Sequence, residues 1–293
     1  MEVVRFDLNH MPEKNPGLSL ALGNFDGVHV GHQALFVETA LHAKGDSGVL
    51  LFSKPFGEGP FLSSIEDKIR FALSSRLDIV YVLENDDSLF FLSPEEFIDT
   101  VLKPLGCSRV VMGEDFRFGA KASGNPETLK AHFDVEVVPL LCLEGTKVSS
   151  STIKDRLLAG YVEGAREMLG KSYEIVGKVR QGFGNGRKIG FPTANLELSF
   201  DYLLPKPGVY CGVGYVNGIA HRAMVNVGTN PTVGALSHPI VEAHFLDFDE
   251  DCYGKTCYVS FLAYLREEKK FSSLEELRSQ LLIDLETVKE ILA

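Results

Sequence analysis

The sequence has few cysteines, no long apolar run and no excess of basic side chains, and each absence excludes a class of protein. Its five cysteines are odd in number, and the closest pair, Cys252 and Cys257, matches neither a zinc spacing nor a disulfide framework. No apolar run is long enough to cross a bilayer, so a membrane protein is not expected. The formal net charge of -11 disfavours a surface that tracks phosphates, which argues against nucleic acid as a partner.

The first fifteen residues also lack the basic start, apolar middle and small-residue cleavage site of a secretory signal. We therefore expect a cytoplasmic protein, and nothing in the sequence implies an obligate protein partner. A chain of 293 residues, 45% of them hydrophobic and 24% charged, is typical of a globular protein with two domains of ordinary size.

The segment from residue 18 to about 138 alternates short apolar runs with amphipathic stretches. Continuous apolar strands separated by helices indicate a parallel sheet that is covered on both faces. The first half of the chain is therefore predicted to be a doubly wound α/β domain, in which ligands bind beyond the carboxyl ends of the strands. The runs that carry this prediction are "LSLAL", "HQALFVETALHA", "GVLLF", "SIEDKIRFALSS", "DIVYVL", "PEEFIDTVLKPL" and "SRVVMG".

The second half changes to closely spaced β-branched strands with turn residues between them, from Tyr173 onward. This pattern of short strands and turns predicts a small antiparallel barrel. Residues 149–170 are expected to form two short helices broken at Gly160, and residues 272–292 one closing helix with a serine cap. The predicted domains are residues 1–158 and 159–293, the second beginning with a helical connector over 159–172.

Two histidines follow the first apolar strand and a glycine turn, in "LGNFDGVHVGH". His29 and His32 are three residues apart at the start of a helix, where unpaired backbone N–H groups and the helix dipole favour a phosphate. Gly31 lets the backbone approach a ligand closely. Imidazoles in this place can donate hydrogen bonds to phosphate oxygens whose charge grows during bond cleavage, which suits nucleotidyl transfer. The alternative is that both histidines are turn and capping residues.

A second segment, "KVSSSTIK" at residues 147–154, places hydroxyls at the head of a helix with a lysine one turn in. It predicts a site for the outer phosphates of a triphosphate, with Lys154 or Lys147 as a counter-charge. A serine-rich helix cap without ligand is the alternative for this segment taken alone.

Four motifs in order along the chain resemble those of the bacterial bifunctional riboflavin kinases and FAD synthetases: "GNFDGVHVGH", "GEDFRFG", "VSSSTIK" and "GFPTAN". The resemblance implies an amino-terminal adenylyltransferase domain of the nucleotidylyl transferase superfamily and a carboxyl-terminal riboflavin kinase barrel. It also implies that riboflavin and ATP yield FMN, and that FMN and a second ATP yield FAD, with Mg²⁺ as cofactor.

The resemblance assigns roles in the adenylyltransferase half. His29 and His32 would stabilise the transition state as catalytic residues, and the remaining positions would bind ATP. Those ATP-binding positions are Gly23, Asn24, Asp115, Ser150, Ser151 and Lys154.

The kinase half is expected around residues 177–196, where five glycines between Gly177 and Gly190 permit a loop that folds around phosphates, although no Walker motif is present. By resemblance, Glu242 would be the catalytic general base and Arg266 would contact the flavin, unless Arg266 is an exposed charge. Gly182 and Gly190 would bind ATP, and Thr193 and Asn195 would bind both ATP and Mg²⁺.

Three departures from the family pattern leave alternatives open: Lys154 stands where arginine is usual, "FSKPF" lacks a histidine, and Gln181 often is histidine. One half could therefore be a flavin- or nucleotide-binding module without activity. A class I aminoacyl-tRNA synthetase is the second alternative, since "HVGH" and "KVSSS" echo that class, but the acidic charge argues against it.

Overall fold

A computed structural model describes residues 2–84, 87–181, 186, 189–229 and 239–293. It divides into two compact units, Met1–Ser150 and Ser151–Ala293, and each is described by itself.

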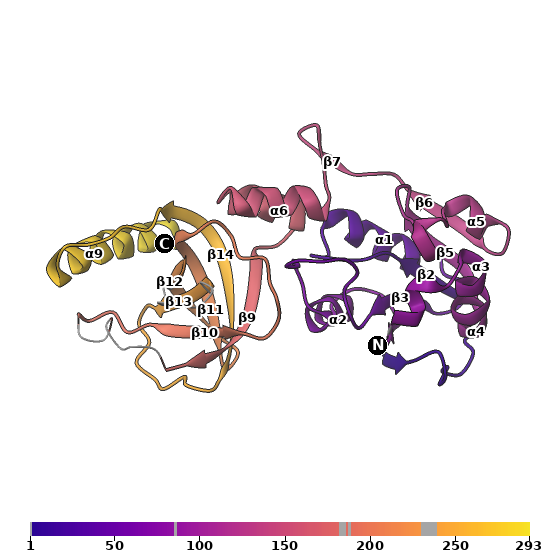
Figure 1. Cartoon of the computed structure of the whole chain (residues 1–293), viewed down its shortest axis with the longest axis horizontal. Helices are drawn as coiled ribbons and strands as arrows, with labels where there is room; N and C mark the ends of the chain where they lie inside the picture. Colours follow the sequence, from indigo (N-terminus) through magenta and orange to yellow (C-terminus); the bar gives the residue numbers. More distant parts are fainter. Residues whose placement is uncertain (1, 85–86, 182–185, 187–188, 230–238) are drawn as a thin grey trace. The chain divides into compact units, whose positions relative to one another are not determined.

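The first unit is built on a six-stranded parallel sheet in the order β1-β4-β3-β2-β5-β6. Figure 1 labels β3, β2, β5 and β6 of this sheet. The chain builds outward from β2 in one direction through β3 and β4, and in the other through β5 and β6, so the order reverses between β2 and β5. A ligand site is expected at the carboxyl ends of those two strands. The strands are β1 (Glu2–Phe6), β2 (Leu18–Leu22), β3 (Ser47–Phe52), β4 (Ile79–Leu83), β5 (Cys107–Gly113) and β6 (Asp134–Val138).

Helices cover both faces of this sheet, which confirms the doubly wound fold. Leu18, Leu20 and Leu22 of β2 point into one core with the helical segments over residues 94–105, whereas Ala21 points into the other core with α1 and α2. All five residues of β2 are buried, as a strand covered on both faces requires. The helices are α1 (Val30–Leu41), α2 (Ile65–Leu73), α3 (Pro94–Phe97), α4 (Lys103–Leu105) and α5 (Pro126–Lys130), with a π-helical segment over Ile98–Leu102 and 3₁₀ turns over Asp87–Phe91 and Ala120–Ala122.

A hairpin of β7 (Cys142–Leu143) and β8 (Thr146–Lys147) leads to α6 (Ser150–Leu158) and α7 (Val162–Leu169). Gly160 separates these two helices with a φ of +83°, a backbone conformation that glycine adopts without steric cost. The predicted pair of short helices with a break at Gly160 is therefore confirmed.

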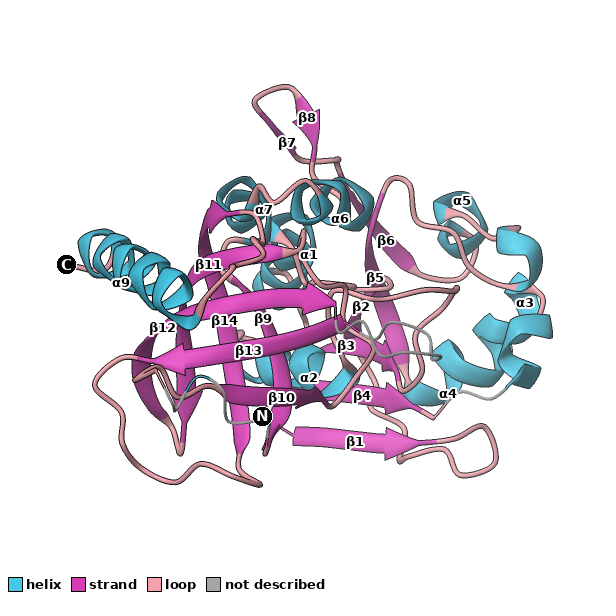
Figure 2. Cartoon of the chain, turned by 60° about the vertical axis from the view of Figure 1, so that its left-hand side comes forward, coloured by secondary structure: helices cyan, strands magenta, loops and turns pink. Residues whose placement is uncertain are grey.

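The second unit contains a closed antiparallel barrel in the order β10-β13-β12-β11-β14-β9, as the sequence predicted (Figure 2). The closing helix α9 (Leu274–Ile291) begins at Ser273, whose side chain accepts a hydrogen bond from the Glu276 N–H. Its Val288 packs in a core cluster with residues of β11 and β12. The barrel strands are β9 (Tyr173–Arg180), β10 (Ala194–Leu198), β11 (Gly208–Val216), β12 (Ile219–Thr229), β13 (Pro239–Phe245) and β14 (Thr256–Arg266).

Candidate active sites

The turn after β2 is held in an unfavourable backbone conformation. Phe25 and Val28 have φ angles of 54° and 44°. The left-handed region is disfavoured for a β-branched residue such as Val28, and strain of this kind is concentrated at functional sites. A Cβ on Gly23 would lie 3.0 Å from the Phe25 ring, so a larger residue there would press against that ring.

The segment that leads into α2 holds this turn in place. Asp26 is buried and its Oδ1 accepts hydrogen bonds from the backbone N–H groups of Leu62 (2.8 Å) and Ser63 (3.1 Å). Lys68 of α2 donates from Nζ to the Asn24 carbonyl oxygen at 2.9 Å. These bonds fix the strained turn from a part of the chain about forty residues away.

Sequence reasoning missed Lys68. Its side chain is buried, and burial lowers its pKa to about 8, although the charges of Asp26 and Asp67 oppose that change. The position carried a signal, because Lys68 falls on the apolar stripe of α2 between Ile65 and Ala72. A lysine at a core position needs a polar partner, and here that partner is the turn that carries Asn24.

The two histidines of the turn lie against each other. His29 is the N-cap of α1, and its Nδ1 accepts a hydrogen bond from the His32 N–H at 3.3 Å. The two rings stack with centroids 3.6 Å apart. A Cβ on Gly31 would lie 3.1 Å from His29 Nδ1, so this glycine makes room for the imidazole. The capping interpretation is confirmed for His29, and it leaves the other ring nitrogen available for a substrate.

Burial keeps both imidazoles neutral near pH 7. It lowers the pKa of His29 to about 4 and that of His32 well below its usual value. Because Nδ1 of His29 accepts a hydrogen bond, the single proton of the neutral ring lies on Nε2, which is then a donor. Within the described part of the chain the buried Nδ1 of His32 has no hydrogen-bond partner, and such orphaned groups are uncommon outside functional sites.

We expect the wild-type protein to lose more thermal stability than a His29→Gln variant when the pH falls from about 6.5 to about 4. The folded-state pKa of His29 is about 4, so the unfolded chain, with its usual value of 6.5, binds the extra proton in this window and is favoured by it. The difference corresponds to at most about 3 kcal/mol. Scanning calorimetry of both proteins across this range measures it, and parallel curves would show that His29 does not titrate in this way.

A carboxylate and an ammonium group lie beside the histidines. Asp115 follows β5, and its Oδ2 is 2.7 Å from Nζ of Lys147 at the end of β8. The charge of Asp115 raises the pKa of His29 and that of Lys147 lowers it, although burial outweighs both. The Ser150 hydroxyl donates to the Asp26 carbonyl oxygen at 2.9 Å.

The fold thus gathers most of the predicted adenylyltransferase positions at the carboxyl edge of β2 and β5. Gly23, Asn24, His29, His32, Asp115 and Ser150 all lie there. Ser151 and Lys154 lie on α6 in the second unit, and their roles stay predictions.

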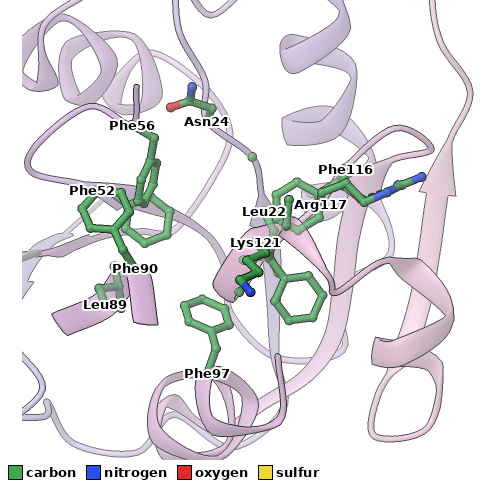
Figure 3. A pocket seen from close by; sticks show the side chains of 14 residues that line it. Leu22, Asn24, Phe52, Phe56, Leu89, Phe90, Phe97, Phe116, Arg117 and Lys121 are labelled. Carbon is green, nitrogen blue, oxygen red and sulfur yellow. Dashed lines mark hydrogen bonds between the residues drawn. The ribbon is translucent and has the colours of Figure 1, made fainter. Parts of the chain in front are cut away.

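An aromatic cavity of about 400 Å³ opens at the same edge of the sheet. Asn24 lies at its border, Lys121 lies among the rings and Arg117 points away (Figure 3). The motifs "FSKPF" and "GEDFRFG" each contribute two phenylalanines to its wall, so these aromatic residues line a cavity in addition to packing in the core. The large apolar side chains of the lining are Leu22, Phe52, Phe56, Leu89, Phe90, Phe97, Phe116 and Phe118.

Two cavities of the barrel unit meet at Thr193. The smaller, of about 290 Å³, is lined by Phe191, Met224, Glu242 and Arg266 among others, and the larger, of about 600 Å³, by Asn195 among others. Thr193 lines both. The larger cavity also includes Gln181, one of the departures from the family pattern.

Strand register brings two of the predicted kinase residues together. Asn195 on β10 is directly opposite Glu242 on β13. Directly opposite residues share a face of the sheet. Thr193 directly precedes β10 and lines the smaller cavity together with Glu242. Burial raises the pKa of Glu242 above its usual value, which is a change that improves a carboxylate as a general base.

Arg266 ties β14 to the closing helix. Its guanidinium donates from Nε and Nη2 to the Asp284 carboxylate at 2.7 to 3.0 Å, and from Nη1 to the Glu267 carbonyl oxygen. The side chain is only 14% exposed, so the interpretation as an exposed charge is wrong. It lines the smaller cavity, and its contact with flavin stays a prediction.

The loop glycines are only partly described. Gly182 lies outside the described residues. Gly190 has a φ of +86° and open space around it, so backbone conformation explains the glycine. Among the aromatic residues of this half, Tyr210 is fully buried, whereas Phe191 and Phe245 line the smaller and larger cavities respectively.

Comparisons with known proteins agree with this arrangement. The FAD synthetase family model matches residues 11–152 and the riboflavin kinase model matches residues 169–292. The bifunctional riboflavin kinase/FMN adenylyltransferase of Listeria monocytogenes is 34% identical over 89% of this chain and 88% of its own. That of Haemophilus influenzae is 35% identical over 93% and 94%, and that of Escherichia coli strain K12 is 32% identical over 99% and 97%.

A crystal structure titled as a macrolide-efflux protein from Streptococcus pneumoniae superposes with a TM-score of 0.88, at 29% identity over 98% of both chains. In the part of our chain that the structure describes, no helix is long and apolar enough to span a bilayer.

The two family models together define a flavin-cofactor enzyme with two transferase domains. The chain belongs to the family of bifunctional riboflavin kinases/FMN adenylyltransferases. This assignment decides against the aminoacyl-tRNA synthetase alternative.

Proposed function

We propose that the first unit transfers the adenylyl group of ATP to FMN at the carboxyl edge of its sheet, and that the barrel phosphorylates riboflavin at Glu242. As a member of its family, the chain is a bifunctional riboflavin kinase and FMN adenylyltransferase. Its substrates and products are ATP, riboflavin, FMN and FAD.

Adenylyl transfer requires positioning and charge stabilisation. A phosphate oxygen of FMN forms the new bond to the α-phosphorus of ATP, and the bond from that phosphorus to the bridging oxygen breaks to release pyrophosphate. The FMN phosphate is already nucleophilic at neutral pH, so no strong base is needed. The Nε2–H of His29 donates to the phosphates as their charge grows, with His32 stacked behind it.

The aromatic cavity supports an acceptor with a flat ring system. Its phenylalanines offer faces and edges for stacking, and Lys121 among them supplies a cation for an anionic group. We propose that the isoalloxazine ring of FMN occupies this cavity, with Gly23 and Asn24 at the border toward ATP.

In the barrel, Glu242 accepts the proton of the terminal ribityl hydroxyl as that oxygen bonds to the γ-phosphorus and ADP leaves. The smaller, apolar cavity binds riboflavin and the larger binds ATP. The γ-phosphoryl group is then transferred from ATP to riboflavin beside Thr193, which lines both cavities. Arg266 borders the riboflavin cavity, and Gly182 and Gly190 belong by resemblance to the ATP loop.

Thr193 and Asn195 fit a magnesium ion that arrives with ATP. Magnesium prefers oxygen ligands and is commonly held by one or two side chains together with substrate phosphates. Asn195 lies directly opposite Glu242 and Thr193 lines the smaller cavity with Glu242, so both offer oxygen atoms near that carboxylate. When bound there, Mg²⁺ neutralises phosphate charge.

Three further expectations stay proposals. Ser151 and Lys154 would hold the outer phosphates in adenylyl transfer. The functional domain boundary would fall between residues 158 and 159. The five free thiols are consistent with a reducing cytoplasm.

The observation that carries the proposal is that two family models match one chain, each on a unit with its own cavities. Purified protein incubated with riboflavin, ATP and magnesium, with the flavins separated by chromatography, is expected to yield FMN and then FAD. Recovery of unmodified riboflavin would refute the kinase. FMN without FAD would support the alternative that the first unit only binds.

A further inference from the structure

His244 makes a hydrogen bond that no motif indicates. It lies on β13, and its Nδ1 is 2.8 Å from the carbonyl oxygen of Pro192. A carbonyl oxygen only accepts, so Nδ1 carries a proton and donates it. The imidazole also packs against Phe191, with ring centroids 5.2 Å apart. One polar and one apolar contact thus hold the two residues that precede Thr193.

This bond lies where the strand ladder ends. The pairing of β10 with β13 begins at Ala194 opposite Ala243, so Pro192 and Thr193 lie just outside it. Proline has no N–H and cannot extend the ladder as a donor. The His244 side chain therefore takes the place of a ladder bond and attaches the Pro192 carbonyl to β13.

The same strand carries the general base of the proposed kinase. Glu242 and His244 are two residues apart and share a face, and both line the smaller cavity with Thr193. Strand β13 therefore positions Glu242 directly and positions Thr193 through His244. Catalysis of phosphoryl transfer depends on such mutual positioning.

We propose that His244 is a positioning residue of the kinase site. Its Nδ1–H fixes the Pro192–Thr193 peptide so that Thr193 and Glu242 both act on the same phosphoryl group. The proposal rests on the proposed riboflavin kinase activity. It places the function on Nδ1, in contrast to a direct contact between Nε2 and riboflavin.

Replacing His244 by asparagine or by glutamine distinguishes the roles of its two ring nitrogens. In His244→Asn the amide group lies near the place of Nδ1 and can still donate to Pro192, whereas in His244→Gln it lies near the place of Nε2. His244→Phe keeps an aromatic ring against Phe191 and removes both nitrogens. The kcat of FMN formation and the KM values for ATP–magnesium and riboflavin are measured for the wild type and the three variants.

We expect His244→Asn to remain within about threefold of the wild type, and His244→Gln and His244→Phe to lose up to about 100-fold in kcat/KM for ATP–magnesium, the cost of a misplacement of about 1 Å. The KM for riboflavin is expected to stay unchanged. Adenylylation of supplied FMN by the same preparations, together with their thermal unfolding, controls for folding.

An active His244→Gln beside an impaired His244→Asn would overturn the proposal in favour of a contact through Nε2. Equal loss in all three variants, or no loss in any, would also overturn it. If His244→Phe does not fold, the two amides still decide, because they differ by one methylene. A wild type without FMN formation would refute the proposed function instead, so the two failures are distinguishable.

Discussion

Replacing His29 by alanine is expected to abolish FAD formation while FMN continues to accumulate. The variant removes the Nε2–H group that we propose donates to the phosphates, and it lies outside the barrel unit. Loss of one such preorganised donor costs about 10²- to 10³-fold in kcat. Chromatography of flavins formed from riboflavin, ATP and magnesium measures both products in one reaction.

Two variants control this experiment. His29→Asn keeps an N-cap acceptor for α1, so the helix start is retained while the imidazole donor is lost, and FAD formation should still fail. His10→Ala removes an exposed histidine of the same unit and should leave both activities intact. FAD formation by His29→Ala at the wild-type rate would remove the imidazole from the mechanism.

Replacing Glu242 by glutamine is expected to abolish FMN formation while supplied FMN is still adenylylated. Glutamine keeps the size of the side chain but cannot accept the proton of the ribityl hydroxyl. Loss of a general base costs about 10²- to 10⁴-fold. Rates with riboflavin and with FMN as the starting flavin measure the two activities separately.

Glu286→Gln is the matched control, because it neutralises an exposed carboxylate on α9 that is paired with Lys289. It should leave both rates unchanged. Loss of both activities in folded Glu242→Gln protein would show that the two sites are not independent. Undiminished FMN formation would assign the general base to another group.

Local patterns were sufficient for the architecture. The mostly apolar run at Leu18–Leu22 predicted a strand buried on both faces, and the structure has it at the centre of the parallel sheet. A serine cap with a glutamate three residues on predicted the start of the last helix, and the structure has that cap at Ser273. Such patterns can be recognised in a sequence because they depend on residues within a few positions of each other.

Hydrogen-bond partners that are far apart in the sequence could not be predicted in this way. Lys68 donates to a carbonyl oxygen 44 residues away, and His244 donates to one 52 residues away. No spacing in the sequence links these partners. Arg266 was open to interpretation as an exposed charge because its partner, Asp284, lies on the next element. Backbone carbonyls are present at every residue, so a sequence does not mark which one a buried side chain will reach.

The sequence by itself determined the two domain types, the order of the elements and the motifs that place histidines after β2 and a threonine and an asparagine at the start of β10. Only the tertiary structure decided that the His29 and His32 rings stack, that Asn195 faces Glu242 and that one threonine borders two cavities. The physical reason is that strand order and register, which the whole core selects, determine which distant side chains meet.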